Sequence, residues 1–349
     1  MSHGFARKGL TSEIAAPGGA WQRKADWLTL PSVGEGEQKI VLLYAVFNGP
    51  SNYVAFTITG NYTVDWGDGT TPQDVSSDVK AQRNLAWADY SADTLTSQGY
   101  RQAIVTITPQ SGQNITGVNF TVRHDTPTVA HSDGLLEVRM STPFATSITF
   151  SAAVNVAHAY GEQVEVVGTT AITSCSEVFR SWRALGSVVG TEWTANGTNF
   201  SSMFNGCPSL QTLPLLNTAA GTNFSNMFNA CSSLQTIPLL NTAAGTSFYS
   251  MFASCLSLQT IPLLNTAAGT SFSSMFASCS SLQQGALSGT RFTISYASCL
   301  LSASALDDIY TNLGTASGGA QTITVSGNFG TTGDTPSIAT AKGWSVSGS

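Results

Sequence analysis

Apolar residues in the second half of the chain alternate between two spacings. An i, i+3, i+4, i+7 pattern, one face of a helix of about two turns, is formed by Phe248, Met251, Phe252 and Cys255. The next stretch, residues 258–264, does not fit that period and predicts a short extended segment, because Pro262 restricts its preceding residue to β or polyproline conformations. The NTAAGT segment after it predicts a turn in which Gly269 adopts a positive φ.

This unit recurs every 24 residues, most cleanly over residues 199–284. One unit buries too few side chains to be stable alone, so neighbouring units must stack and share strand hydrogen bonds, as in a solenoid. Stacked coils with paired strands place equivalent residues about 4.8 Å apart. The predicted core columns are Phe204, Phe228, Phe252 and Phe276; Met203, Met227, Met251 and Met275; and Cys207, Cys231, Cys255 and Cys279.

Imperfect copies of the repeat flank the clean repeats on both sides, and they predict capping units at the two ends of the solenoid. Residues 178–185 imitate the start of a unit, and residues 292–299 imitate residues 272–279. After them, residues 305–313 predict a helix, and residues 322–325 and 344–346 predict strands.

The MF-x-x-C-x-S-L and L-x-x-[LI]-P-x-L-N-T motifs of residues 165–300 resemble the BspA-like leucine-rich repeats, with a looser match out to Ser349. That resemblance implies a short strand and a short helix in each coil. Members of the family are mostly cell-surface proteins of bacteria or protists that act in adhesion and protein binding, so the resemblance implies a binding role.

The first half of the chain predicts an all-β domain. The apolar run 40–47 predicts a buried strand, Tyr62, Val64 and Trp66 alternate as in a strand, and residues 99–108 predict a later strand. The YTVDWGDGT segment resembles the signature of PKD-like β-sandwich domains. Two roles stay open for Asp65 and Asp68: they hold the tight turn through hydrogen bonds, or they bind Ca²⁺.

An N-terminal arm, residues 1–34, precedes this domain and carries Arg7, Lys8, Trp21 and Trp27. The tryptophans either anchor the chain to a partner or cover the sandwich. The ADWLTLP segment, the DWGDGT strand and the repeats together resemble structural proteins of tailed bacteriophages.

The sequence thus predicts an α+β multidomain protein. Its parts are a docking arm (1–34), a PKD-like or immunoglobulin-like sandwich (35–130) and a leucine-rich-repeat solenoid with caps (131–349).

The number and position of the charged residues exclude several classes of function. Charged residues make up 10% of the chain, the formal net charge is −6, and residues 193–290 contain no Asp, Glu, Lys or Arg. Nucleic-acid binding needs clustered cations, so we expect none. Acid–base and metal chemistry need titratable side chains. No Ser-His-Asp, HExxH or GxSxG grouping appears among the scattered His3, His124, His131 and His158, so we expect no enzymatic activity, cofactor or metal.

Two further expectations concern the location of the protein in the cell. No apolar segment follows the basic residues at the start of the chain, so we expect no signal peptide. The longest apolar run has eight residues, too short to cross a membrane.

The cysteine column has three interpretations: disulfides between coils, a metal site, or small apolar residues that complete the core, which we favour. Asn217, Asn241 and Asn265 form either a binding surface or hydrogen bonds to the turn backbone of adjacent coils. Between the core positions lies a neutral, hydroxyl-rich face with the apolar points Tyr249 and Leu256, which we expect to contact a glycan or another subunit.

We therefore expect a non-enzymatic structural protein of a tailed-phage virion, assembled in the host cytoplasm as a homo-oligomer. Its arm and sandwich would dock on other virion proteins, and its repeats would bind the host surface or neighbouring copies, as in a tail fibre. The alternatives are a capsid decoration or vertex protein and a bacterial cell-surface adhesin of the BspA-like type.

Overall fold

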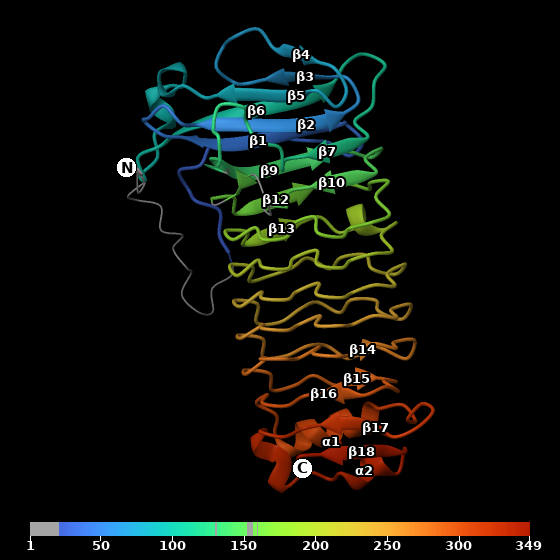
Figure 1. Cartoon of the computed structure of the whole chain (residues 1–349). Coiled ribbons are helices and arrows are strands. Elements are labelled where there is room, and N and C mark those ends of the chain that lie inside the picture. Colours follow the sequence, from blue (N-terminus) through green and yellow to red (C-terminus); the bar gives the residue numbers. More distant parts are fainter. Residues whose placement is uncertain (1–20, 130, 152–155, 159) are drawn as a thin grey trace.

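The computed structural model describes residues 21–129, 131–151, 156–158 and 160–349. Figure 1 shows an elongated molecule with a β-sandwich at one end, a column of stacked coils in the middle and the C-terminal helices at the other end. The first part of the predicted arm, with Arg7 and Lys8, lies outside the described residues.

The sandwich consists of two sheets. The first has the order β13-β12-β9-β1-β6-β3-β4, with bounds β13 (Ser187–Val189), β12 (Gln163–Val166), β9 (Leu135–Ser141), β1 (Lys39–Val46), β6 (Arg101–Pro109), β3 (Tyr62–Asp65) and β4 (Gln73–Val75). The second has the order β10-β7-β2-β5, with bounds β10 (Ser147–Thr149), β7 (Gly117–Asn119), β2 (Tyr53–Thr59) and β5 (Lys80–Asn84). The predicted strands at residues 40–47, 62–66 and 99–108 are confirmed as β1, β3 and β6.

Strand β1 is apolar from Ile40 to Val46 because both of its faces are covered. Leu42 and Tyr44 face the interior of the sandwich, whereas Val41 and Leu43 pack against Trp27 of the N-terminal segment.

The sandwich passes into the solenoid without a break in its sheets. Strand β9 pairs antiparallel with β1 on one side and parallel with β12 on the other. In the second sheet, β7 pairs antiparallel with β2 and parallel with β10. A single hydrophobic cluster extends from Ile40 to Trp344. The division of the chain at residues 34 and 130 stays a prediction.

Short elements lie beside these sheets and between the coils. A two-stranded sheet pairs β8 (His131–Ser132) with β11 (Val156–Ala157), and another pairs β14 (Leu264–Asn265) with β15 (Leu287–Ser288). Three 3₁₀ turns are η1 (Trp87–Asp89), η2 (Ala92–Thr94) and η3 (Glu192–Thr194).

The expectation of a short helix in each coil is wrong. Residues 200–207, which are all described, form successive turns, in which the Met203 N–H donates to the Phe200 carbonyl (3.3 Å). Alternate amides instead donate to the next coil: Phe200 N–H to Asn223 O at 2.8 Å, and Phe204 N–H to Met227 O at 2.9 Å. A helix of two turns is only marginally stable by itself. The neighbouring coil, which has the same sequence, offers hydrogen-bond partners along the whole segment, so the segment pairs with that coil instead of forming a helix. The structure is therefore mostly β, and the α+β label is not confirmed.

Positive φ angles occur where the sequence did not predict them. Ser202, Asn226, Ser250 and Ser274 have φ between 50° and 57°, whereas Gly269, predicted to need a positive φ, is not among the positive-φ residues. Gly269 is required for space, because a Cβ there would lie 2.4 Å from Phe272 Cζ.

The C-terminal cap matches the expected elements. Helix α1 (Ala303–Asn312) begins at Ser302, whose hydroxyl accepts the Ala305 N–H at 3.2 Å. A parallel sheet of β16 (Ile294–Ser295), β17 (Gln321–Thr324) and β18 (Trp344–Ser347) follows, with η4 (Phe329–Thr332) and α2 (Ser337–Thr340) beside it. The helix and the two strands predicted from sequence are confirmed.

Candidate functional site

All twelve residues of the predicted Phe, Met and Cys columns are buried. The Phe204 and Phe228 ring centroids lie 5.7 Å apart with a 4° interplanar angle. The column continues in both directions, through Phe179 to Phe150 and Phe120 of the sandwich and through Phe276 to Tyr296 of the cap. A second column joins Phe200, Phe224, Phe248 and Phe272. These residues form the interior of the coils and support their surface.

The six cysteines, all described, are free and buried. The Cys231 thiol donates to the Phe204 carbonyl of the preceding coil at 3.1 Å, and Cys255 makes the equivalent bond to Phe228 at 3.0 Å. Burial raises the pKa of Cys207 to about 12, so this thiol is protonated at neutral pH. In the structure the cysteines are therefore small core residues whose thiols are weak hydrogen-bond donors, which is the interpretation that we favoured.

The outer surface of the coils holds both predicted contact residues. Tyr249 is 45% exposed and Leu256 is 50% exposed. A third apolar feature, which was not predicted, is an exposed leucine column formed by Leu215 (57%), Leu239 (60%) and Leu263 (51%). The Pro-Leu-Leu motif carries the signal: adjacent residues of an extended segment point to opposite sides. One leucine of each pair is therefore buried, as Leu216, Leu240 and Leu264 are.

The asparagine column stabilises turns, but not in the way we expected. Asn265 Oδ1 accepts the Ala267 N–H of its own coil at 3.1 Å, and Asn241 accepts that of Ala243 at 3.2 Å. The bond to the adjacent coil comes from the buried threonines instead, as when the Thr242 hydroxyl donates to the Asn265 carbonyl at 2.7 Å.

Both tryptophans of the arm contact the body of the protein. Trp27 is 4% exposed, and its indole N–H donates to the Tyr100 hydroxyl at 2.8 Å. The half-buried Trp21 donates to Glu162 Oε2 at 3.1 Å. Trp27 therefore covers the sandwich, which was the alternative to a partner contact, and only part of Trp21 is open to solvent.

Charged side chains gather near these tryptophans. Arg23 pairs with Glu137 at 2.8 Å, and Lys24 pairs with Glu162 at 2.9 Å. Burial raises the pKa of Glu137, although the Arg23 bond opposes that shift. The sandwich end of the molecule therefore carries charged side chains, whereas the coils of residues 193–290 are neutral.

Asp65 and Asp68 hold their own turn. Asp65 Oδ1 accepts the Gly67 N–H at 2.9 Å, Asp68 Oδ1 accepts the Thr70 hydroxyl at 2.6 Å, and Asp68 also pairs with Arg83. Within the described part of the chain, no cluster of three or more His, Cys, Asp or Glu side chains could hold a metal ion.

A buried contact between His158 and Asp133 lies where the sandwich meets the solenoid, and it could not be predicted from the sequence. His158 Nδ1 lies 3.2 Å from Asp133 Oδ1, and the imidazole ring packs 4.8 Å from the ring of Trp182. Twenty-five residues separate His158 from Asp133, so no local motif marks the pair.

None of the helices in the described ranges is both long enough and apolar enough to cross a membrane.

Comparison with known proteins gives one family. The model of the Mycoplasma protein of unknown function DUF285 matches residues 147–261 and 173–292. No curated protein matches the chain. Most of the matched residues belong to the stacked coils, and the match begins at β10 of the second sheet. Together the match and the β-solenoid fit a BspA-like repeat protein.

Proposed function

We propose that this chain is a non-enzymatic structural protein of a tailed-phage virion, in which a rigid solenoid projects from the particle and binds through its side. The arm and sandwich would dock on other virion proteins, and the coils would bind the host surface or neighbouring copies of the chain. The PKD-like character of the sandwich belongs to this proposal.

The observation that carries the proposal is the side surface of the coils. It presents the regularly spaced leucine column of Leu215, Leu239 and Leu263 on a stretch without any charged residue. Exposed apolar residues in a regular row indicate a surface that another molecule covers. A surface without charge does not attract a binding partner from a distance. Such a surface therefore suits an assembled array, in which many weak contacts act together.

The interior of the coils supports a mechanical role. Their buried positions are filled by aromatic, methionine and cysteine side chains, and the thiols are neutral. A solenoid in which every coil bonds to its neighbours resists bending and keeps its surface residues in register.

The test is an electron-microscopic reconstruction of particles purified from the cells that produce the chain. The proposal expects density for the sandwich against the particle and for the coils projecting from it. A head location with the coils packed on the capsid would favour the decoration or vertex protein. Particles without this chain would contradict the proposal.

A second candidate is a bacterial cell-surface adhesin, which the resemblance of the coils to BspA-like repeats favours. Antibody labelling of intact bacteria that express the chain separates the two: an adhesin labels living cells, whereas a virion protein labels only released particles.

A further inference from the structure

The hydrogen-bond ladder between coils is interrupted near its C-terminal end. In the preceding coils, the Phe224 N–H donates to Ser247 O at 2.9 Å and the Phe248 N–H donates to Ser271 O at 2.8 Å. In the next coil, the equivalent backbone N–H groups of Phe272, Ser274 and Phe276 have no hydrogen-bond partner among the described residues. Each of them points, by the geometry of the ladder, toward the following coil.

A change of coil length explains the interruption. Cys299 follows Cys279 by 20 residues rather than 24, and β16 pairs with β17 instead of with residues 271–275. Thr293 also forms its hydrogen bonds away from the preceding coil, since its N–H and its hydroxyl both donate to Gln321 Oε1, at 2.8 and 2.9 Å.

The interruption is confined to one side of the solenoid. On another face, the Thr266 N–H still donates to Ser288 O at 2.8 Å. In the interior, the Phe276 and Tyr296 rings stack at 4.7 Å. The coils thus stay joined inside and separate outside, which opens a cleft of about 560 Å³.

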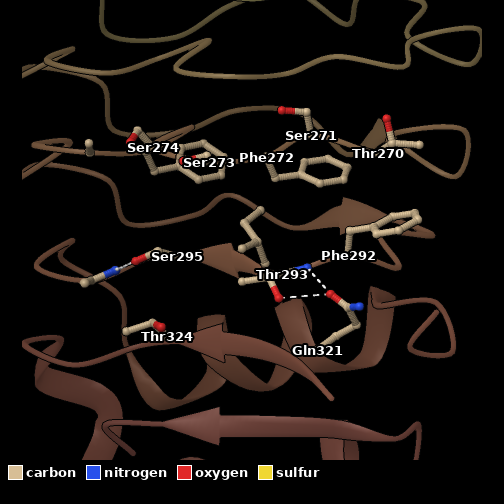
Figure 2. Close-up of a pocket in the computed structure, with 14 residues that line it drawn as sticks. Thr270, Ser271, Phe272, Ser273, Ser274, Phe292, Thr293, Ser295, Gln321 and Thr324 are labelled. Carbon is tan, nitrogen blue, oxygen red and sulfur yellow. Dashed lines mark hydrogen bonds between the residues drawn. The ribbon is translucent and has the colours of Figure 1, made fainter. Parts of the chain in front are cut away.

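Figure 2 shows the two walls of this cleft, with Ser273 and Ser274 on one side and Phe292, Thr293 and Ser295 on the other. Its lining combines hydroxyl groups, the Gln321 amide and the half-buried ring of Phe292, and includes no charged side chain. The unpaired N–H groups add hydrogen-bond donors to one wall.

We infer that this cleft binds a neutral saccharide. Hydroxyl and amide groups exchange hydrogen bonds with sugar hydroxyls in both directions, the backbone N–H groups donate to sugar oxygens, and the Phe292 ring offers an apolar face to the C–H side of a pyranose. The cleft lies within the range of about 300–1,000 Å³ that is typical of small-molecule sites. The inference rests on the proposed function, because it names the ligand class of a surface-binding solenoid.

Two other ligand classes fit less well. An inserted peptide strand needs about 4.8 Å on each of its sides, but the stacked Phe276 and Tyr296 rings hold the coils 4.7 Å apart in the interior. An anionic ligand would lack a cation, because no Lys or Arg lines the cleft.

The experiment titrates the full chain with neutral di- to tetrasaccharides of glucose, galactose and N-acetylglucosamine, using calorimetry and hydrogen exchange. Phe292→Ala removes the ring from the cleft, and Gln321→Ala removes the amide together with its hydrogen bonds to Thr293. Phe144→Ala is the matched control, because it removes an exposed ring of the sandwich that lies outside the cleft. Circular dichroism checks that each variant folds.

We expect at least one of these saccharides to bind, with about tenfold weaker affinity in Phe292→Ala or Gln321→Ala and unchanged affinity in Phe144→Ala. The amides of Phe272, Ser274 and Phe276 should exchange quickly in the free protein and slow down when the saccharide binds, while that of Phe224 stays protected throughout.

Three results would overturn the inference: no binding at millimolar saccharide, loss of binding in Phe144→Ala alone, or protection of these amides by uncharged peptides instead of sugars. The particle reconstruction does not depend on saccharide binding, so the proposed function can survive the failure of this inference.

Discussion

Replacing Phe228 with alanine removes one ring from the middle of the aromatic column. The side chain is fully buried, and its ring stacks on Phe204 at 5.7 Å and on Phe252 at 5.6 Å. A buried phenyl group of about 150–200 Å² contributes about 4–5 kcal/mol at about 25 cal/mol/Å². We expect Phe228→Ala to lower the free energy of unfolding by about 3–5 kcal/mol, because coils held by their neighbours cannot collapse around the cavity.

Equilibrium urea unfolding followed by far-ultraviolet circular dichroism measures this change. Leu239→Ala is the control, because the side chain is 60% exposed and its loss should cost less than about 0.5 kcal/mol. The double variant Phe228→Ala/Phe252→Ala should be non-additive by about 0.5–1.5 kcal/mol, since the two rings stack on each other. Equal effects of Phe228→Ala and Leu239→Ala would refute the assignment of the phenylalanines to a shared core.

Three further predictions concern other positions. Gly245→Ala should destabilise by about 1–3 kcal/mol in the same assay, because its Cβ would lie 2.5 Å from Phe248 Cζ; an unchanged midpoint would refute this. The six buried thiols should resist a thiol reagent at pH 8 until urea unfolds the chain. Burial raises the pKa of Cys207 to about 12, so the contribution of this thiol to folding stability is complete below about pH 9 and is lost as the pH rises toward 12. Stability that does not fall above pH 9 would contradict that burial. For Asp68, burial raises the pKa, but the Thr70 hydrogen bonds and the Arg83 charge outweigh this and lower it, so Asp68→Asn should cost about 1 kcal/mol at pH 7. The difference from the parent chain should vanish as the pH falls below about 4, and a difference that persists there would argue against an ionic role.

The core columns could be predicted from sequence because identical residues at a fixed interval require identical surroundings. The spacing of Phe204, Met227 or Cys231 already places them in columns, whichever backbone carries them. The local conformation could not be predicted in the same way. The i, i+3, i+4, i+7 pattern of Phe248 to Cys255 suits a helix, but it does not show that amides bond to the next coil.

Other features needed three-dimensional information to different degrees. The exposed position of Leu215, Leu239 and Leu263 follows from adjacent leucines in an extended segment and could have been found. The cleft had a sequence signal as well, in the shorter interval between Cys279 and Cys299. The continuity of β9 with both β1 and β12 depends on long-range pairing that no local pattern encodes.

The claim that the 24-residue coil is the structural unit is tested most directly by deleting one coil. Removing residues 231–254 joins equivalent positions, so the account predicts a folded, cooperatively unfolding protein with the same circular dichroism spectrum and a solenoid shorter by about 4.8 Å. Removing residues 231–242 takes out half of the same coil and shifts every later column out of register, so that chain should not fold cooperatively. Equal thermal stability of the two deletion variants would contradict the account.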